Sequence, residues 1–433
     1  MNYKTGAYDT DSQRLSGPTF TTDQFRELEL VGTVLQYKDS VRDYWERIGI
    51  GGSISARAFV TPDGVFIGAC DKNFYCLDKN GKEKWRFQTN GVIMESADVS
   101  ETMVYFGSAD QNVYALDVKT GKEIWRFKTN GIVPQKPVVH GGRVYIGSTD
   151  KNLYCLDAHT GKKIWGFHVK EGSILEPLIV NNRIHFCAKD NTYYCCTLDG
   201  NLVWRFLTNG SICGGPAFYH NGKLYIGCWD QNVYCLNETT GERIWAYKAN
   251  APTMIPVVWN NRVYAGCWDK TIYCLDAETG KRIWAHHITD FPSYQVVLQK
   301  GLCIFGTADN KICGIDAETG TERWTVKTNG MNAQLMGIDG TIYAGCWDCK
   351  LYCIDAATGN VNWVFHTSMS TPSPIEPPTE TVTSTVEHII PIEDTQEEQS
   401  RYKEQFSAEG SGSSVYKSSS QYIKKHRYGG GEE

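Results

Sequence analysis

The chain has 433 residues, a net charge of -6 and 16 cysteines. The negative net charge excludes broad coating of nucleic acid as the main mode of action, and no apolar run reaches the length that crosses a membrane. No signal-peptide pattern follows Met1. We therefore expect free thiols and a cytoplasmic protein without a membrane contact.

Residues 1–50 form an extension outside the periodic part of the chain. Residues 21–30 combine capping residues with an apolar pattern, which predicts a short helix. Residues 43–48 contain Trp45, one repeat period before Trp85. We interpret them as a decayed or closing strand against the last repeat, where Trp45 competes with Trp363 for one place.

Residues 51–368 repeat one unit. Nine tryptophans mark it at intervals of 39, 40 or 41 residues: Trp45, Trp85, Trp125, Trp165, Trp204, Trp245, Trp284, Trp324 and Trp363. In the third unit, strand-like runs at 132–139, 144–148, 153–156 and 162–167 are separated by turn residues. Four antiparallel strands in each of eight complete units predict an all-β, eight-bladed β-propeller.

The end of each unit carries a motif. Residues 115–125 read Ala-Leu-Asp-Val-Lys-Thr-Gly-Lys-Glu-Ile-Trp, which resembles the tryptophan-docking motif Ala-x-Asp-x-x-x-Gly-x-x-x-Trp of PQQ-like, quinoprotein-type propeller repeats. Variants of it end at Trp165, Trp245, Trp284, Trp324 and Trp363. The first unit is one residue shorter, and the fourth lacks the Thr-Gly turn, which puts docking there in doubt. An indole has a large apolar ring and an N–H that needs an acceptor, so we expect these tryptophans to be structural.

The resemblance implies the propeller fold and also raises an activity. The best-known members oxidise alcohols or sugars with pyrroloquinoline quinone and calcium, and they have adjacent cysteines, matched here by Cys195-Cys196. This pair lies within a predicted strand, where neighbouring side chains point to opposite faces. The family's calcium-binding and base carboxylates have no recognisable counterpart. We therefore expect no cofactor and no catalytic residue.

Two short patterns have the spacing of metal ligands. They are Cys346-x-x-Cys349 and His185-x-Cys187. Structural zinc sites use four ligands, and neither pattern has a second pair nearby in its own unit. We expect no bound metal.

Three tryptophans lie outside the docking set. Trp229, Trp268 and Trp347 each occur in a Gly-Cys-Trp-Asp sequence before the second hairpin of a unit. On one rim of the ring they are candidate anchors for a protein partner. In the alternative interpretation each covers a neighbouring loop, such as 208–210 or 328–330.

The innermost strands predict a polar central channel. Aligning them on their prolines brings to one level Arg57, Ser96, Lys136, Glu176, Gly215, Ile255, Gln295 and Gln334. The candidate channel residues are the long polar ones, Arg57, Lys136, Glu176, Gln295 and Gln334. Both a solvated pore with mutual ion pairing and a site for a small polar ligand are compatible with this set.

Residues 369–433 change composition from proline-rich to acidic and then to basic. Such a segment is expected to be disordered on its own. Its candidate contacts with protein or RNA are Tyr416, Lys417, Tyr422, Lys424, Lys425, Arg427 and Tyr428. A solubilising tail is the alternative.

Together these features favour a non-catalytic scaffold that binds protein partners through its blade loops and tails, as a monomeric propeller within a larger complex. One alternative is an enzyme similar to quinone-dependent dehydrogenases, or a small-ligand sensor. Another is an RNA or ribonucleoprotein accessory factor that binds through the basic tail.

Overall fold

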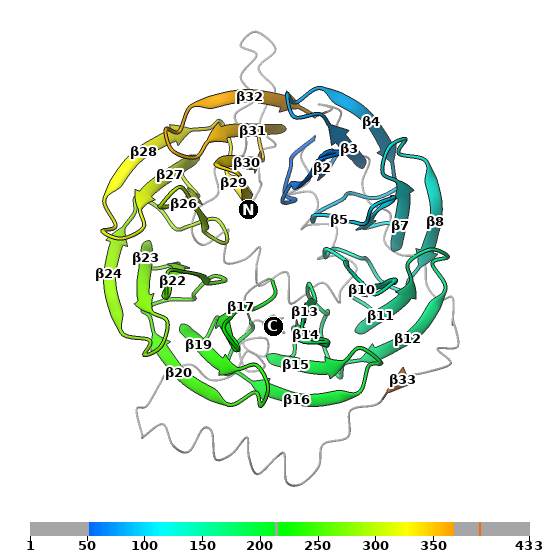
Figure 1. Cartoon of the computed structure of the whole chain (residues 1–433), viewed down its shortest axis with the longest axis horizontal. Helices are drawn as coiled ribbons and strands as arrows, with labels where there is room; N and C mark the ends of the chain where they lie inside the picture. The colour runs from blue at the N-terminus through cyan, green and yellow to red at the C-terminus, as the bar shows by residue number, and fades with distance from the viewer. Residues whose placement is uncertain (1–51, 213–214, 368–388, 391–433) are drawn as a thin grey trace, which may run out of the picture. The chain divides into compact units, whose positions relative to one another are not determined.

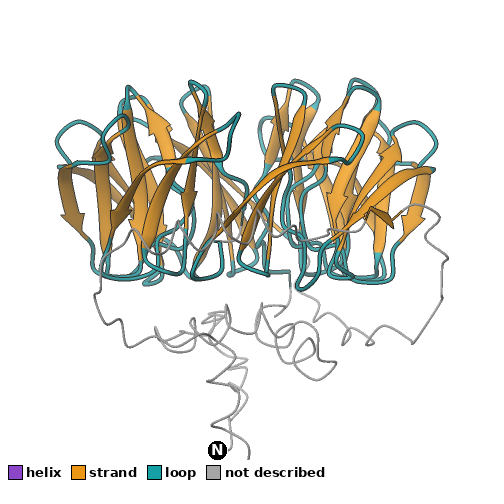
Figure 2. Cartoon of the chain, turned by 90° about the horizontal axis from the view of Figure 1, so that it is seen from below, coloured by secondary structure: helices purple, strands orange, loops and turns teal. Residues whose placement is uncertain are grey.

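The computed structural model describes residues 52–212, 215–367 and 389–390. Eight blades of four antiparallel strands follow one another around a ring, each with these strands in sequence order from the centre outward (Figure 1). Loops gather at both ends of the strands (Figure 2). The predicted eight-bladed, all-β propeller is confirmed.

The strands occupy the same four places in every blade. The innermost are β1 (Phe59–Thr61), β5 (Asp98–Val99), β9 (Val138–His140), β13 (Leu178–Val180), β17 (Phe218–His220), β21 (Val257–Trp259), β25 (Val297–Gln299) and β29 (Asn332–Ile338). The second are β2 (Gly64–Gly68), β6 (Met103–Gly107), β10 (Arg143–Gly147), β14 (Arg183–Ala188), β18 (Lys223–Gly227), β22 (Arg262–Cys267), β26 (Leu302–Thr307) and β30 (Thr341–Cys346).

The outer half of each blade is equally regular. The third strands are β3 (Asn73–Leu77), β7 (Asn112–Asp117), β11 (Asn152–Asp157), β15 (Thr192–Thr197), β19 (Asn232–Asn237), β23 (Thr271–Asp276), β27 (Lys311–Asp316) and β31 (Lys350–Asp355). The outermost are β4 (Glu83–Gln88), β8 (Glu123–Lys128), β12 (Lys163–His168), β16 (Leu202–Leu207), β20 (Arg243–Lys248), β24 (Arg282–His287), β28 (Glu322–Lys327) and β32 (Val361–His366).

The repeated turn residues explain why the hairpins form where they do. Between β6 and β7, the Asp110 carboxylate accepts hydrogen bonds from the Asn112 N–H, at 3.0 Å, and the Tyr114 hydroxyl, at 2.7 Å. Between β11 and β12, Gly161 has a φ of 69°. A Cβ atom on Gly161 would lie 2.6 Å from the Trp125 ring of the preceding blade, so this glycine is required both by the turn and by the indole.

The docking tryptophans join neighbouring blades. The Trp125 indole N–H donates to the Ala158 carbonyl oxygen of the next blade at 2.9 Å. Six others make the corresponding bond: Trp85, Trp165, Trp204, Trp245, Trp324 and Trp363. The Trp284 N–H has no partner among the described residues. Docking in the fourth unit, which the sequence put in doubt, is present. Trp204 donates to the Glu238 carbonyl at 3.1 Å, and Trp165 donates to the Leu198 carbonyl at 3.2 Å although the fourth unit lacks the Thr-Gly turn.

The last blade closes against the first. The Trp363 indole donates to the Lys79 carbonyl at 2.9 Å, and the Ile54 N–H donates to the Cys346 carbonyl at 3.1 Å. Blade 8 has all four of its strands from residues 332–366. The closing strand expected around Trp45 and the expected N-terminal helix lie outside the described residues.

The chain divides into two units, residues 1–391 and 392–433. The second lies wholly outside the described residues. In the first, β33 (Ile389–Ile390) pairs in parallel with β12. Among the residues that the structure describes, no helix is long and apolar enough to cross a membrane.

Candidate functional site

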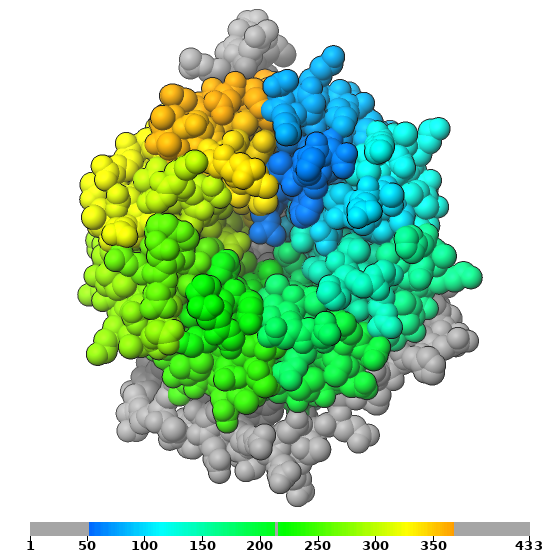
Figure 3. Space-filling model, viewed as in Figure 1, coloured from blue at the N-terminus to red at the C-terminus, as the bar shows by residue number. Residues whose placement is uncertain are grey.

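Polar side chains from opposite sides of the ring meet in its central channel, where Figure 3 shows the surface hollowed. The Arg57 Nη2 atom lies 3.4 Å from Glu176 Oε1, and Arg57 Nη1 lies 3.5 Å from Gln295 Oε1. Lys136 Nζ lies 3.7 Å from the same Glu176 oxygen. These residues precede the innermost strands of blades 1, 3, 4 and 7. The sequence alignment put these four residues at one level, and the structure brings them into contact.

Glu95 belongs to the same group, although sequence reasoning missed it. The Gln334 side-chain amide donates to the Glu95 carboxyl. Burial, and then the nearby Glu176 carboxylate, raise the pKa of Glu95 to about 8, against the opposing effect of Arg57. The alignment put Ser96 at this level, and a shift of one residue exchanges the two faces of an extended segment. We call Arg57, Glu95, Lys136, Glu176, Gln295 and Gln334 the channel cluster.

The three rim tryptophans differ in exposure. Trp268 and Trp347 are only 4% and 6% exposed, whereas Trp229 is half-buried. The Trp229 and Trp268 rings meet edge to face at 5.1 Å. Burial counts against Trp268 and Trp347 as anchors for a partner, because both belong to the hydrophobic core of blades 5–8. The alternative interpretation, a cover over neighbouring loops, fits these two.

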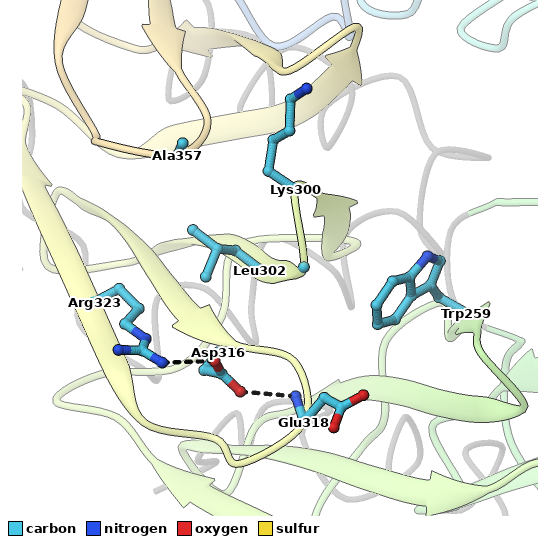
Figure 4. A pocket seen from close by; sticks show the side chains of 8 residues that line it. Trp259, Lys300, Leu302, Asp316, Glu318, Arg323 and Ala357 are labelled. Carbon is cyan, nitrogen blue, oxygen red and sulfur yellow. Dashed lines mark hydrogen bonds and ion pairs between the residues drawn. The ribbon is translucent and has the colours of Figure 1, made fainter.

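A pocket of about 460 Å³ opens where the first and third hairpins of blades 6–8 come together (Figure 4). Its lining includes Trp259, Lys300, Leu302, Glu318 and Ala357. Trp259 ends β21 and is half-buried, and Leu302 is 7% exposed. The pocket lies at the end of the strands opposite to Trp229, because hairpins alternate between the two ends of a blade. Sequence reasoning missed it; the signal was a Trp where the other blades have smaller side chains.

The ion pair in the pocket is satisfied internally. Arg323 Nη2 lies 2.8 Å from Asp316 Oδ2, and Asp316 Oδ1 accepts a 3.0 Å hydrogen bond from the Glu318 N–H. The Arg323 pair lowers the pKa of Asp316 to about 2. The Glu318 carboxylate itself has no hydrogen bond or ion pair within the described part of the chain. In Figure 4 it lies on the same side of the pocket as the Trp259 indole, and the Lys300 ammonium points away from both.

A buried polar group sits between blades 4 and 5. His185 Nε2 lies 3.2 Å from Glu238 Oε1 and 3.9 Å from Cys195 Sγ. Burial lowers the pKa of His185 to about 4 despite the nearby Glu238. Burial also raises the pKa of Cys195 to about 12, so this thiol is protonated at neutral pH and is not an activated nucleophile.

The other chemistry-bearing cysteines are also used inside the fold. Cys187 Sγ donates to the Gly215 carbonyl at 3.4 Å, and Cys346 Sγ to the Gly330 carbonyl at 3.2 Å. Cys195 and Cys196 are both fully buried in β15. Within residues 52–212, 215–367 and 389–390, no three His, Cys, Asp or Glu side chains are grouped as metal ligands. The candidate tail contacts from Tyr416 to Tyr428 lie outside the described residues.

The PQQ_2 family model, described as outer membrane protein assembly factor BamB, matches residues 32–134, 109–253, 197–296 and 229–386. The chain belongs to this family. No curated protein matches the sequence.

Three solved structures have a similar fold. BamB from Moraxella catarrhalis is 16% identical, with a TM-score of 0.61 over 69% of this chain and 96% of that one. Sqt1 from Saccharomyces cerevisiae is 11% identical, with a TM-score of 0.61 over 73% and 96%. A quinohemoprotein alcohol dehydrogenase from Pseudomonas putida HK5 is 15% identical, with a TM-score of 0.56 over 65% and 67%. At these identities the likeness shows the fold alone.

Proposed function

We propose that this propeller is a non-catalytic scaffold that brings protein partners together. The observation that carries the proposal is the placement of its surface aromatic residues. Trp229 lies half-buried at one end of the strands, and Trp259 lies half-buried beside a pocket at the other end. Aromatic side chains in partly buried sites are frequent anchors of protein interfaces, and here both faces of one rigid ring carry one.

The proposal also holds that the chain is not an enzyme. The side chains with nucleophilic chemistry serve the fold: burial raises the pKa of both Cys195 and Cys196 well above the usual thiol value, and their backbone positions in β15 alternate between its two faces. The quinohemoprotein dehydrogenase shares only the fold. In the proposal no quinone cofactor is bound.

The partners are proteins, and the propeller takes part as one copy in a larger complex. A cytoplasmic location is part of the proposal. Each described cysteine is a buried thiol, as is usual for proteins in a reducing compartment. Contacts through the basic tail, with protein or RNA, extend the same proposal beyond the described residues.

A native pull-down tests the function. The full chain, the chain without residues 369–433, and the Trp229→Ala and Trp259→Ala variants serve as baits, and captured proteins and RNA are identified by mass spectrometry and sequencing. We expect the full chain to capture one set of proteins. Purified components should reproduce this binding, and Trp229→Ala or Trp259→Ala should weaken it. Failure of every purified candidate to bind the full chain would contradict the scaffold.

A second measurement tests the absence of quinone catalysis. Pyrroloquinoline quinone and calcium are added to the full chain with alcohols or sugars. We expect no saturable quinone binding, no thermal shift and no dye reduction. Saturable binding with turnover would replace the scaffold by an oxidoreductase.

A further inference from the structure

The pocket beside Trp259 differs by one ion pair from the equivalent places at two other seams between blades. Where blade 3 meets blade 4, Arg143 of β10 pairs with Asp199 in the next blade's third hairpin, at 3.0 Å. Where blade 5 meets blade 6, Lys223 of β18 pairs with Glu278 at the same place. At these two seams the acidic turn residue is paired with the base that begins the second strand of the preceding blade.

Blades 6 and 7 break this pattern. The equivalent base, Arg262, donates from Nη1 to the Glu318 carbonyl oxygen at 3.0 Å and leaves the carboxylate unpaired within the described residues. In the same blade the innermost strand ends in Trp259, where β9 and β17 end in His140 and His220. A carboxylate that lacks the ion pair found at those two seams therefore lines the same pocket as Trp259, and no other innermost strand ends in a tryptophan.

This combination has a specific chemistry. A cation over an indole is attracted to the face of the ring, and a neighbouring carboxylate adds an ion pair. A guanidinium suits both, because it is planar and stacks on aromatic rings while its N–H groups reach a carboxylate. We propose that Trp259 and Glu318 form a binding site for a single arginine side chain of a protein partner.

The rest of the pocket limits what can enter. Leu302 and Ala357 give the pocket apolar lining that fits the aliphatic stem of an arginine. Arg323 is already paired with Asp316, and the exposed Lys300 ammonium contributes to the lowered pKa of Asp355. Lys300 repels a second cation and favours an acidic neighbour, so the site selects an isolated arginine rather than a basic run such as Lys424-Lys425.

The inference rests on the proposed scaffold function and names one of its contacts. It can be tested without the partner. The full chain is prepared with ¹⁵N-labelled tryptophan, and the indole signal of Trp259 is assigned with Trp259→Phe. N-acetylarginine amide is titrated against it, and N-acetylcitrulline amide serves as the uncharged match.

We expect a saturable shift of the Trp259 signal with arginine amide, and binding about tenfold weaker with citrulline amide or in Glu318→Gln. Glu278→Gln is the matched control, because Glu278 is already paired with Lys223, and it should bind arginine amide as the parent chain does. Thermal melts verify that each variant is folded.

Three results would overturn the site. They are no saturable shift, equal binding of arginine and citrulline, and equal losses in Glu318→Gln and Glu278→Gln. Tighter arginine binding after removal of residues 369–433 would assign the site to the chain's own tail instead of a partner. If Glu318→Gln still captures the same partners, the proposed scaffold function stands and only the proposed arginine site is contradicted.

Discussion

The outer seams between blades and the central channel are built by opposite means. At the seams, one indole repeats its hydrogen bond to the next blade seven times, from Trp85 round to Trp363. In the channel, six different polar side chains meet, and the Arg57 contacts are long, at 3.4 and 3.5 Å. Neutral contacts that repeat from blade to blade hold the ring together, whereas the channel cluster is charged and occurs once.

One seam departs from this rule. Between most blades a tyrosine packs beside the docking indole, as Tyr105 does with Trp125 at 5.8 Å. Between blades 4 and 5 its place is taken by His185, which contacts Glu238 in the next blade. The seams should therefore respond to loss of apolar volume, and this seam and the channel should respond to pH.

The largest effect is expected at a regular seam. Trp125 is 8% exposed and bonded to Ala158, so Trp125→Ala should lower the free energy of unfolding by about 3–5 kcal/mol. Ile124→Ala is the control on the same strand, because Ile124 is 48% exposed, and it should change stability by no more than about 0.5 kcal/mol. Denaturant melts measure both. Equal losses would mean that the indole does not hold the seam.

The next effect tests the two reassigned tryptophans. Trp268 is 4% exposed and packs against Phe291, with ring centroids 5.7 Å apart. Trp268→Ala should therefore destabilise the chain by about 3 kcal/mol, close to the docking tryptophans. The half-buried Trp229 should cost clearly less when changed to Ala. A Trp268→Ala variant as stable as the parent chain would restore Trp268 as a surface anchor.

A smaller effect is expected at the blade 4–5 seam. Burial lowers the pKa of His185 from 6.5 to about 4. The unfolded chain then takes up a proton between pH 6.5 and about 4 that the folded chain refuses, so stability falls as pH decreases through this window. His185→Gln removes the proton uptake and should flatten the fall. Melts across the window that give parallel curves for the two chains would contradict this.

A residue that recurs at one interval has the same structural role in every blade. The sequence therefore predicted the contacts between blades better than the contacts in the channel. Nine tryptophans at one interval reveal the blades, and Ala115 and Gly121 reveal the space for the indole. A contact that occurs only once in the ring produces no periodic pattern in the sequence. Glu95 was missed by a shift of one residue. The roles of Glu238 and Glu318 depend on residues of a neighbouring blade, His185 and Trp259 respectively. Trp268 and Trp347 were ambiguous because the same Gly-Cys-Trp-Asp sequence serves a buried or an exposed ring.

The last effect concerns the channel, where the Arg57 contacts are 3.4 and 3.5 Å long. Burial and the Glu176 charge raise the pKa of Glu95 from 4.5 to about 8, and its other neighbours are Arg57, the Ser96 N–H and the Gln334 amide. Between pH 4.5 and about 8 the folded chain keeps a proton that the unfolded chain releases. Stability should therefore fall as pH rises through this window, and the contribution of Glu95 should be lost above it.

Glu95→Gln removes the contribution of Glu95 titration to the free energy of unfolding, because Gln can still accept the hydrogen bond from Gln334 but does not titrate. The difference in unfolding free energy between parent and variant should change steadily from pH 5 to pH 8, in favour of the variant at the alkaline end. A difference that stays constant over this range would show that Glu95 ionises normally and that the channel is more open to water than its side-chain contacts indicate. The His185 window lies below pH 6.5, so of these two groups only Glu95 contributes to the change between pH 6.5 and about 8.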